Sequence, residues 1–463
     1  MAPLVLGIDS STQSTKALLV DAETGQVLEE RRSSHPDGTE VDPRAWLDAV
    51  DEAAGPLLER ADALAVGGQQ HGMVLLDEAG EVVRPALLWN DTRSADAASA
   101  LIDEMGGAQA SVEEIGSLMV ASFTASKLRW VRDEEPENAQ RAAQVLLPHD
   151  FVSLHLAESG TAPFTDRGDA SGTGYYSTRE EAWKPELVEA ALGKNLELPR
   201  LPSAPNEVMA RTASGAAIAA GTGDNMGAAL GLSLGPGDVS VSIGTSGVCA
   251  MVSDARPGDA SGTVTGFADA TGRFLPMTTT INASRILEAG RALLGVSHEE
   301  MAELALASEP GANDVTLLPY FDGERTPNRP HARATLTGMS TSTTREDVAR
   351  AYVEALLCSL ADGITSLEER TGTAARRITL IGGGARSRAV QQLAPAIFGR
   401  EVTIAPDGEF VALGAARQAA WALAGTEEPP AWEISGSRVV TADATPEVLG
   451  AYRELKERTA DWS

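Results

Sequence analysis

The sequence predicts an α/β protein made of two domains of similar size, and three observations support this prediction. The chain has 463 residues, which is more than one typical hydrophobic core supports. Strand-like and helix-like segments alternate along it. A pattern of apolar strand, polar turn and second strand covers residues 4–20 and returns in the other half at 239–248. Two related hairpins in two halves indicate two similar domains.

Composition excludes several classes of function. The 66 acidic residues outnumber the 37 basic ones, and the net charge of −29 argues against a nucleic-acid partner, whose phosphates would be repelled. No segment approaches the roughly 18 apolar residues that cross a bilayer, so we expect no membrane partner. No basic region precedes the first apolar run, which argues against a signal peptide. Cys249 and Cys358 indicate buried thiols in a reducing compartment, and we expect a cytoplasmic protein.

The elements of the first half follow from local signals. After the opening hairpin, Asp42 and Pro43 predict a helix start, with Asp42 as N-cap and Pro43 as the first helical residue. The other segments expected in this half are a strand at 63–66 ending in Gly67–Gly68, a hairpin of 73–76 and 81–83 turned by 77–80, and helices at 95–105 and 127–132.

A change of composition marks the domain boundary. The segment 214–232 is rich in Gly and Ala and is followed by Leu-Gly-Pro-Gly at 234–237, so we expect domains of 1–233 and 234–463. In the second domain the sequence predicts a long amphipathic helix at 345–367, a strand at 378–381, a glycine triplet at 382–384 and a last core helix from about residue 412.

The two polar turns have the composition of phosphate-binding loops, because they combine hydroxyls with accessible backbone N–H groups. Asp9 stands where its carboxylate can meet hydrated Mg²⁺. The candidate phosphate-binding residues are Ser11, Thr12, Gln13, Ser14 and Lys16 around the first turn and Gly244, Thr245 and Ser246 in the second. For the first hairpin taken alone, a polar hairpin without a ligand is the alternative.

Two further segments are candidates for ligand contact. Gly383, Gly384 and Ala385 let the backbone lie close to a nucleotide, although such a triplet after a strand also serves helix–sheet packing. Asp224 follows a Gly-Thr-Gly turn that brings its carboxylate near a substrate. A cap for a helix beginning near Asn225 explains Asp224 equally well from spacing alone.

Six segments resemble the FGGY family of carbohydrate kinases, and the resemblance extends over essentially the whole chain. They are 68–72, 88–93, 122–131, 223–225, 318–327 and 334–354. The resemblance implies two ribonuclease H-like domains of the actin-like ATPase/sugar kinase type, with an active-site cleft between them, and ATP and Mg²⁺ as cofactors. Tyr352 departs from the second family signature, where a smaller or aliphatic residue is usual, and this change affects helix packing.

The same resemblance implies roles for individual residues. Asp224 would be the general base, and Asp9 would organise Mg²⁺ instead of accepting a proton. The sugar would be bound by Gln70, His71, Trp89, Asp224 and Asn225. Relatives often carry Met where Gln70 stands. A structural role remains the alternative for His71, a core position for Trp89, and a local ion pair for Asp91 with Arg93.

The resemblance implies ATP-dependent phosphorylation of D-xylulose at its primary hydroxyl. Dimers are common among relatives, so a homodimer is a possible assembly of this chain. Alternatives are a family member that acts on another ketose or polyol, such as ribulose or L-xylulose, a non-catalytic sugar sensor, and an actin-like polymer. The presence of Asp9 and Asp224 argues against the sensor, and the sugar-pocket segments argue against the polymer. A glycerol kinase is disfavoured because its Gln-Arg-Glu element is absent near Gln70. No His/Cys cluster has the spacing of a zinc site.

Overall fold

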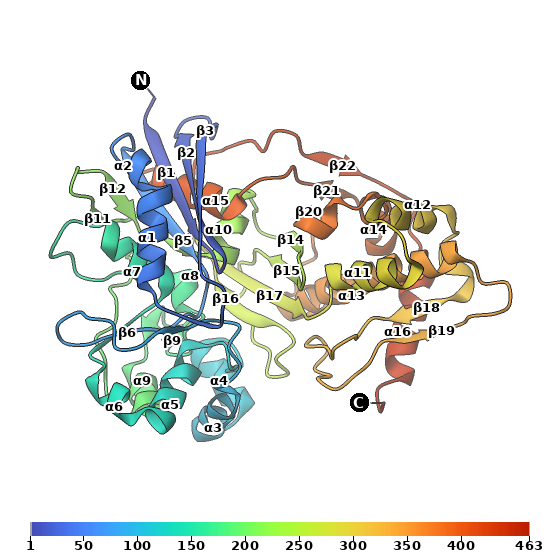
Figure 1. The fold of residues 1–463 in the computed structure, drawn as a ribbon, viewed down its shortest axis with the longest axis horizontal. Helices are drawn as coiled ribbons and strands as arrows, with labels where there is room; N and C mark the ends of the chain where they lie inside the picture. Colours follow the sequence, from blue (N-terminus) through green and yellow to red (C-terminus); the bar gives the residue numbers. More distant parts are fainter. Residues whose placement is uncertain (1, 463) are drawn as a thin grey trace. The chain divides into compact units, whose positions relative to one another are not determined.

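The computed structural model describes residues 2–462, which fold into two compact units, each built around a mixed β-sheet (Figure 1). The first unit comprises Met1–Leu234, Asp254–Leu275 and Gly408–Glu433, and the second comprises Gly235–Ser253, Pro276–Asp407 and Ile434–Ser463. The sequence predicts a single boundary, between residues 233 and 234. In the structure two segments from beyond that point, 254–275 and 408–433, belong to the first unit.

The sheet of the first unit has the strand order β11-β12-β5-β1-β2-β3, with β13 paired to β5. Its strands are β1 (Leu4–Ser10), β2 (Ser14–Asp21), β3 (Val27–Ser34), β5 (Ala63–Gly68), β11 (Val208–Arg211), β12 (Ala217–Ala219) and β13 (Thr222–Gly223). β1 and β2 form the predicted antiparallel hairpin. β1 and β13 both run parallel to β5, with Ser10 and Gly223 each opposite Gly68. The carboxyl ends of these three strands therefore meet at one edge of the sheet.

The central strands of this sheet are buried on both faces, because they alternate apolar side chains between two cores, whereas the edge strand β3 is largely exposed. Leu6 and Ile8 of β1 pack on one face with Trp46 and Val152. Val5 of β1 lies in the core of the other face. The first face is covered by α1 (Arg44–Ala53) and α7 (Pro148–Leu156), and the second by α15 (Phe410–Ala424), which contributes mainly alanines (Figure 1).

Helix α15 approaches its neighbours so closely that only glycine fits at the contacts. A Cβ atom on Gly414 of α15 would lie 1.9 Å from the carbonyl oxygen of Gly227 in α10 (Asp224–Gly231). A Cβ atom on Gly7 of β1 would lie 1.9 Å from the carbonyl oxygen of Ala412. This packing holds α10 and β1 against the same helix, and it fixes the position of Asp224 at the start of α10.

The other elements of the first unit surround this sheet. They are β4 (Glu40–Val41), α2 (Gly55–Leu58), β6 (Val74–Leu76), β7 (Ala86–Leu87), α3 (Ala95–Met105), α4 (Ala108–Ile115), α5 (Thr124–Glu134), α6 (Pro136–Arg141), β8 (Gln144–Leu146), α8 (Arg167–Ala170), β9 (Tyr176–Ser177), β10 (Ala182–Trp183), α9 (Pro185–Leu192) and β16 (Thr265–Ala268). The predicted helix 95–105 is confirmed, and the helix predicted at 127–132 is longer at both ends.

The second unit repeats the arrangement of the first. Its sheet includes β17 (Phe274–Thr280), β15 (Gly247–Met251), β14 (Asp238–Ile243), β20 (Arg377–Ile381), β21 (Val402–Ile404) and β22 (Arg438–Val440), in this order. β14 pairs antiparallel with β15, with Ile243 opposite Gly247, and parallel with β20. These are the relations that β1 has to β2 and β5, so the prediction of two similar α/β domains is confirmed.

Helices and short elements complete the second unit. They are α11 (Ser284–Leu294), α12 (His298–Ala307), η1 (Ala312–Asp314), β18 (Thr316–Leu318), β19 (Thr335–Thr337), α13 (Arg345–Thr371), η2 (Gly383–Arg386), α14 (Arg388–Phe398) and α16 (Pro446–Arg458). Helix α13 begins with a capping box between Thr344 and Asp347. The ring of Tyr352 on α13 fits because Gly290 lacks a side chain, since a Cβ atom there would lie 2.7 Å from the ring.

Two local predictions differ from the structure. Helix α1 begins at Arg44 with Pro43 as its N-cap, one residue later than predicted. The side chain of Asp42 still accepts a hydrogen bond from the N–H of Arg44. Residues 81–83 form no separate strand, but the predicted hairpin closes: Leu76 and Val82 form an antiparallel bridge, and the N–H of Val83 donates to the Leu75 carbonyl. β6 pairs with β8 as well, a partner that the sequence did not predict.

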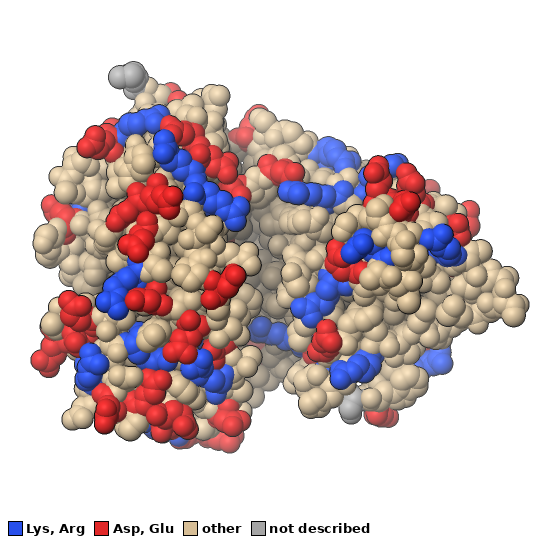
Figure 2. Space-filling view, viewed as in Figure 1, with Lys and Arg blue, Asp and Glu red and all other residues tan. Residues whose placement is uncertain are grey.

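Charged side chains are distributed over the surface. On the face drawn in Figure 2, Asp and Glu lie on both units and are interspersed with Lys and Arg. Within residues 2–462, no helix combines the length and the apolar character that crossing a membrane requires.

Candidate active site

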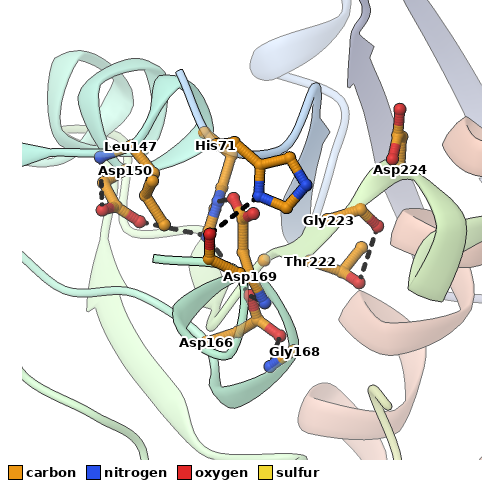
Figure 3. Close-up of polar contacts among 12 residues, drawn as sticks. His71, Leu147, Asp150, Asp166, Gly168, Asp169, Thr222, Gly223 and Asp224 are labelled. Carbon is orange, nitrogen blue, oxygen red and sulfur yellow. Dashed lines mark hydrogen bonds and ion pairs between the residues drawn. The ribbon is translucent and has the colours of Figure 1, made fainter. Parts of the chain in front are cut away.

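The strand ends of the first unit bring together Asp9, Gln70, His71 and Asp224, which lie far apart in the sequence. Asp9 lies near the end of β1, Gln70 and His71 follow β5, and Asp224 follows β13. Figure 3 shows His71 on its loop and Asp224 at the start of its helix. The structure thus collects four predicted site residues within one unit.

Asp224 is the first residue of α10, and Gly223 is the N-cap. The capping alternative, with a helix beginning near Asn225, is therefore wrong by one residue. The Oδ1 atom of Asp224 accepts hydrogen bonds from the backbone N–H and the side-chain amide of Asn225, both at 2.7 Å. Burial and then the charge of Asp9 raise the pKa of Asp224 to about 7. A carboxylate with such a pKa is matched to proton acceptance near neutral pH.

Asp9 is buried, with one carboxylate oxygen engaged and the other without a partner. Its Oδ2 atom accepts a hydrogen bond from the Ser11 hydroxyl at 2.6 Å and lies 3.4 Å from Nζ of Lys16. Its Oδ1 atom is fully buried and makes no hydrogen bond with residues 2–462. Burial raises the pKa of Asp9, although Lys16 and Ser11 oppose the shift. An unpartnered buried carboxylate oxygen fits a site for a hydrated divalent cation.

The first polar turn is held by side chains around it. Nδ1 of His35 donates to the Ser11 carbonyl at 2.9 Å, and the Thr15 hydroxyl lies 2.8 Å from Nε2. The indole of Trp89 donates to the Thr12 hydroxyl at 2.9 Å. Trp89 is 47% exposed, so its alternative assignment to the core is wrong. Sequence analysis missed His35, whose partners come from another strand.

The sequence predicts that Lys16 offers its positive charge to phosphate, but in the structure this charge is paired with two carboxylates. Its Nζ atom lies 2.6 Å from Glu409 as well as 3.4 Å from Asp9. These two carboxylates raise the pKa of Lys16 in spite of its burial, which keeps it protonated. Glu409 directly precedes α15, so this ion pair joins the phosphate turn to a segment from the far end of the chain.

The sugar-side candidates form a connected wall. Oε1 of Gln70 accepts the side-chain amide of Asn225 at 3.2 Å. His71 adopts a left-handed backbone conformation with φ of 68°, and its Nδ1 donates to the Gly172 carbonyl at 2.8 Å (Figure 3). Its ring packs against Phe123 and Phe267, with centroids 5.2 and 5.7 Å away. Asp91 and Arg93 form a local ion pair, as the alternative for these two residues predicted, with Nε of Arg93 2.9 Å from Oδ1 of Asp91.

Lys127 holds the loop that carries His71, and the sequence predicted no role for this lysine. It is fully buried, and its Nζ atom donates to the carbonyl oxygen of His71 at 2.9 Å and to that of Ser122. Burial lowers the pKa of Lys127 to about 7. The residue lies within the segment 122–131, so its position in that motif was the available signal.

The second unit contains a cavity of about 690 Å³ beside its own polar turn. The predicted residues Gly244, Thr245, Gly383 and Gly384 line it. Ser246 and Ala385 do not belong to its lining. The opposite wall comes from α11 and α12, with Leu287, Met301, Ala302, Glu288 and His298. An apolar wall with polar groups and glycine backbone on the other side suits a nucleoside and its phosphates.

Two glycines of the triplet 382–384 pack against β14, and the third borders the cavity. A Cβ atom on Gly384 would lie 2.3 Å from the side chain of Ile243, and one on Gly382 would lie 2.9 Å from the Ile243 carbonyl oxygen. These two glycines are therefore needed for packing against β14. Gly383 meets nothing within 4 Å and borders the cavity.

Comparison with known proteins gives a consistent result. Residues 4–232 match the model described as "FGGY family of carbohydrate kinases, N-terminal domain", and residues 239–423 match the corresponding C-terminal domain. A xylulose kinase of Streptomyces coelicolor is 46% identical over 92% of this chain and 89% of its own. One from Streptomyces rubiginosus is 43% identical over 95% and 93%. The crystal structure of xylulose kinase from Bifidobacterium adolescentis superposes with a TM-score of 0.92 at 46% identity, covering 98% of this chain and 99% of that one.

Proposed function

The chain belongs to the FGGY family of carbohydrate kinases, and from this premise we propose that it transfers the γ-phosphoryl group of ATP to D-xylulose. The products are ADP and D-xylulose 5-phosphate. The observation that supports this sugar is the high identity, along nearly the whole chain, to relatives named xylulose kinase. The connected set of Gln70, Asn225 and Asp224 supplies the polar groups that a sugar with several hydroxyls requires.

In the proposed mechanism Asp224 acts as the general base. Its carboxylate accepts the proton of the primary O5 hydroxyl as O5 forms a bond to the γ-phosphorus. The bond between that phosphorus and the β–γ bridging oxygen breaks, and the electron pair leaves with ADP. Asn225 orients Asp224 through its two hydrogen bonds, and Gln70, His71 and Trp89 contact the sugar.

We assign the Mg²⁺ that accompanies ATP in this chemistry to Asp9, whose unpartnered Oδ1 atom would hold it. When bound, the cation neutralises phosphate charge. The phosphate oxygens would be bound by the first turn, through Ser11, Thr12, Gln13 and Ser14. Lys16 pairs with Glu409 and would therefore hold this turn in place. In the second unit, Gly244, Thr245, Ser246 and the segment 383–385 would bind the nucleotide.

The pKa of Asp224 predicts the pH dependence of the reaction. The base must be ionised, and its pKa is raised to about 7, so activity is present above that pH and is lost as the pH falls through it. We expect kcat/KM for the sugar to fall about tenfold per pH unit below this point. The measurement is a pH profile with coupling enzymes in excess at every pH. A flat profile down to pH 5 would contradict the assignment of Asp224.

Filling the cavity of the second unit should weaken ATP binding selectively. Gly383 borders the cavity and has open space around its missing Cβ, so Gly383→Phe attaches a large side chain there with no clash at Cβ. We expect KM for ATP to rise about tenfold or more, with the affinity for sugar unchanged. Gly450→Phe is the matched control, because Gly450 is also unobstructed and lies outside the cavity. An unchanged KM for ATP would place the nucleotide elsewhere.

The substrate itself is tested by an assay of ADP release across a panel of ketopentoses, hexuloses and polyols. D-xylulose should give the highest kcat/KM. A higher value for D-ribulose or L-xylulose would keep the kinase mechanism and change the sugar. Absence of a sugar-dependent signal with every compound would favour the sensor. We further propose a cytoplasmic enzyme, which the two buried free thiols Cys249 and Cys358 suit, and a homodimer, which sedimentation can test.

A further inference from the structure

A fully buried histidine lies beneath the candidate sugar site and is enclosed by three carboxylates. His149 of α7 has no exposed surface, and Asp150, Asp166 and Asp169 are each at most 2% exposed. Asp150 comes from α7, whereas Asp166 and Asp169 come from the start of α8 (Figure 3). None of these residues has a part in the mechanism proposed above.

Both nitrogens of the His149 ring face carboxylate oxygens. Nδ1 lies 2.7 Å from Oδ2 of Asp169. Nε2 lies 3.2 Å from Oδ1 of Asp150 and 3.8 Å from Oδ1 of Asp166. Only the contact of Nδ1 is a hydrogen bond, and Nε2 has no hydrogen-bond partner within residues 2–462. Carboxylates close to both nitrogens nevertheless stabilise a positive charge on the ring, so this geometry favours the doubly protonated imidazolium.

The electrostatics agree with this geometry. Burial alone would lower the pKa of His149, but the charges of Asp150, Asp169 and Asp166 outweigh burial and raise it to about 10. Burial raises the pKa of each of the three aspartates to about 6, and His149 opposes the shift in every case. A positive charge on the ring and negative charges on the surrounding carboxyl groups therefore stabilise one another.

His149 packs closely against both segments that carry the sugar-side candidates. A Cβ atom on Gly68 would lie 2.8 Å from Cβ of His149, and one on Gly221 would lie 2.6 Å from Cδ2 of its ring. Gly68 ends β5 and directly precedes Gln69, Gln70 and His71, while Gly221 directly precedes β13 and Asp224. One residue thus supports both segments, the first through its Cβ and backbone and the second through its ring.

Hydrogen bonds of Gln70 connect the two segments with each other. Oε1 of Gln70 accepts the side-chain amide of Asn225, which also donates to Asp224. Nε2 of Gln70 is buried and makes no hydrogen bond within residues 2–462. The two segments that pack on His149 therefore share one hydrogen-bonded chain, which ends at the proposed base.

We propose that His149 is a positioning residue for the sugar site: as an imidazolium paired with Asp169, it supports the backbone at Gly68 and Gly221, in the segments that carry Gln70, Asp224 and Asn225. The inference rests on the proposed function, because these three residues are its sugar-binding wall. Without the cation, Asp169 would face Asp150 and Asp166 uncompensated, and the cluster that supports both segments would be destabilised. The effect should appear in the sugar kinetics and leave ATP binding, which uses other residues, unchanged.

The experiment compares His149→Gln, which is neutral, with His149→Lys, which keeps the positive charge. For His149→Gln we expect KM for the sugar to rise and kcat to fall, each on the order of tenfold, with KM for ATP within about twofold. His149→Lys should restore much of the loss. His155→Gln is the control, since His155 lies on the same helix and pairs with Asp51 at the surface. Unchanged sugar kinetics in His149→Gln, or equal loss in the Lys variant, would overturn the proposal.

A second measurement uses the unmodified protein and does not depend on activity. Long-range ¹H–¹⁵N spectra of protein labelled at its six histidines report whether a ring carries one proton or two. We expect His149 to remain doubly protonated at pH 8. A neutral ring would overturn the proposal, as would one equivalent of bound divalent metal, since His149, Asp166 and Asp169 lie within 4.8 Å of one another and could ligate one. A wild-type protein inactive on every sugar would instead refute the proposed function.

Discussion

Asp224→Asn should reduce kcat by a factor on the order of 10² to 10⁴, the contribution expected of a general base. The substitution keeps the size of the side chain and an oxygen that can accept the hydrogen bonds from Asn225. Sugar affinity should therefore remain within a few-fold of the wild-type value. The variant should also fold at least as well, because burial raises the pKa of Asp224 and so disfavours its ionised form at neutral pH.

Three measurements test this expectation together: kcat from a coupled assay, sugar affinity from tryptophan fluorescence, and the melting temperature. Asp254→Asn provides the control, since Asp254 pairs with Arg273 at the surface of the same unit. Substantial kcat in Asp224→Asn would remove Asp224 as the base. Loss of sugar affinity and of thermal stability together would indicate a structural role instead.

Gly414→Ala should strongly destabilise the first unit. Its Cβ atom would lie 1.9 Å from the carbonyl oxygen of Gly227, and this backbone atom can move only if α10 or α15 shifts. We expect a loss of about 3 kcal/mol, the upper part of the range for overpacked cores. A lower melting temperature and reduced kcat should follow, because α10 carries Asp224 at its start.

The contrast with Gly450→Ala makes this prediction specific. Gly450 also lies inside a helix, α16, but its Cβ would meet nothing within 4 Å. Alanine there should stabilise the protein by about 0.5–1 kcal/mol, because it restricts the unfolded chain and favours the helix. Differential scanning calorimetry of both variants should show shifts of opposite sign. A melting temperature of Gly414→Ala equal to the wild type would mean that the two helices can separate freely.

The features that sequence predicted are those encoded by residues close together. The hairpin of β1 and β2 follows from two apolar runs around a polar turn, and its repeat in β14 and β15 revealed the second domain. The parallel pairing of β1 with β5 then explains why Asp9 and the loop at Gln70 meet. Local patterns thus predicted the strands, and strand order decided which side chains share a site.

The features that sequence did not predict join distant segments. Lys16 pairs with Glu409, 393 residues away, and no local pattern indicates such a contact. In the sequence, His149 has no feature beyond its place at the start of a helix. Folding brings Asp166 and Asp169 beside its ring, and no local pattern indicates this. The pairing of β6 with β8 is a further example, because these two strands lie in distant parts of the sequence.

The origin of α15 has a consequence for how the protein is made. The sheet strands of the first unit are complete once Gly223 has been synthesised, but one of its faces packs on α15, which begins at Phe410. During translation that apolar face remains exposed until most of the second unit has been synthesised. Folding in the cell should therefore depend on chaperones that shield apolar surfaces. A circularly permuted chain that begins at residue 408 would synthesise the covering helix first and should fold with less assistance.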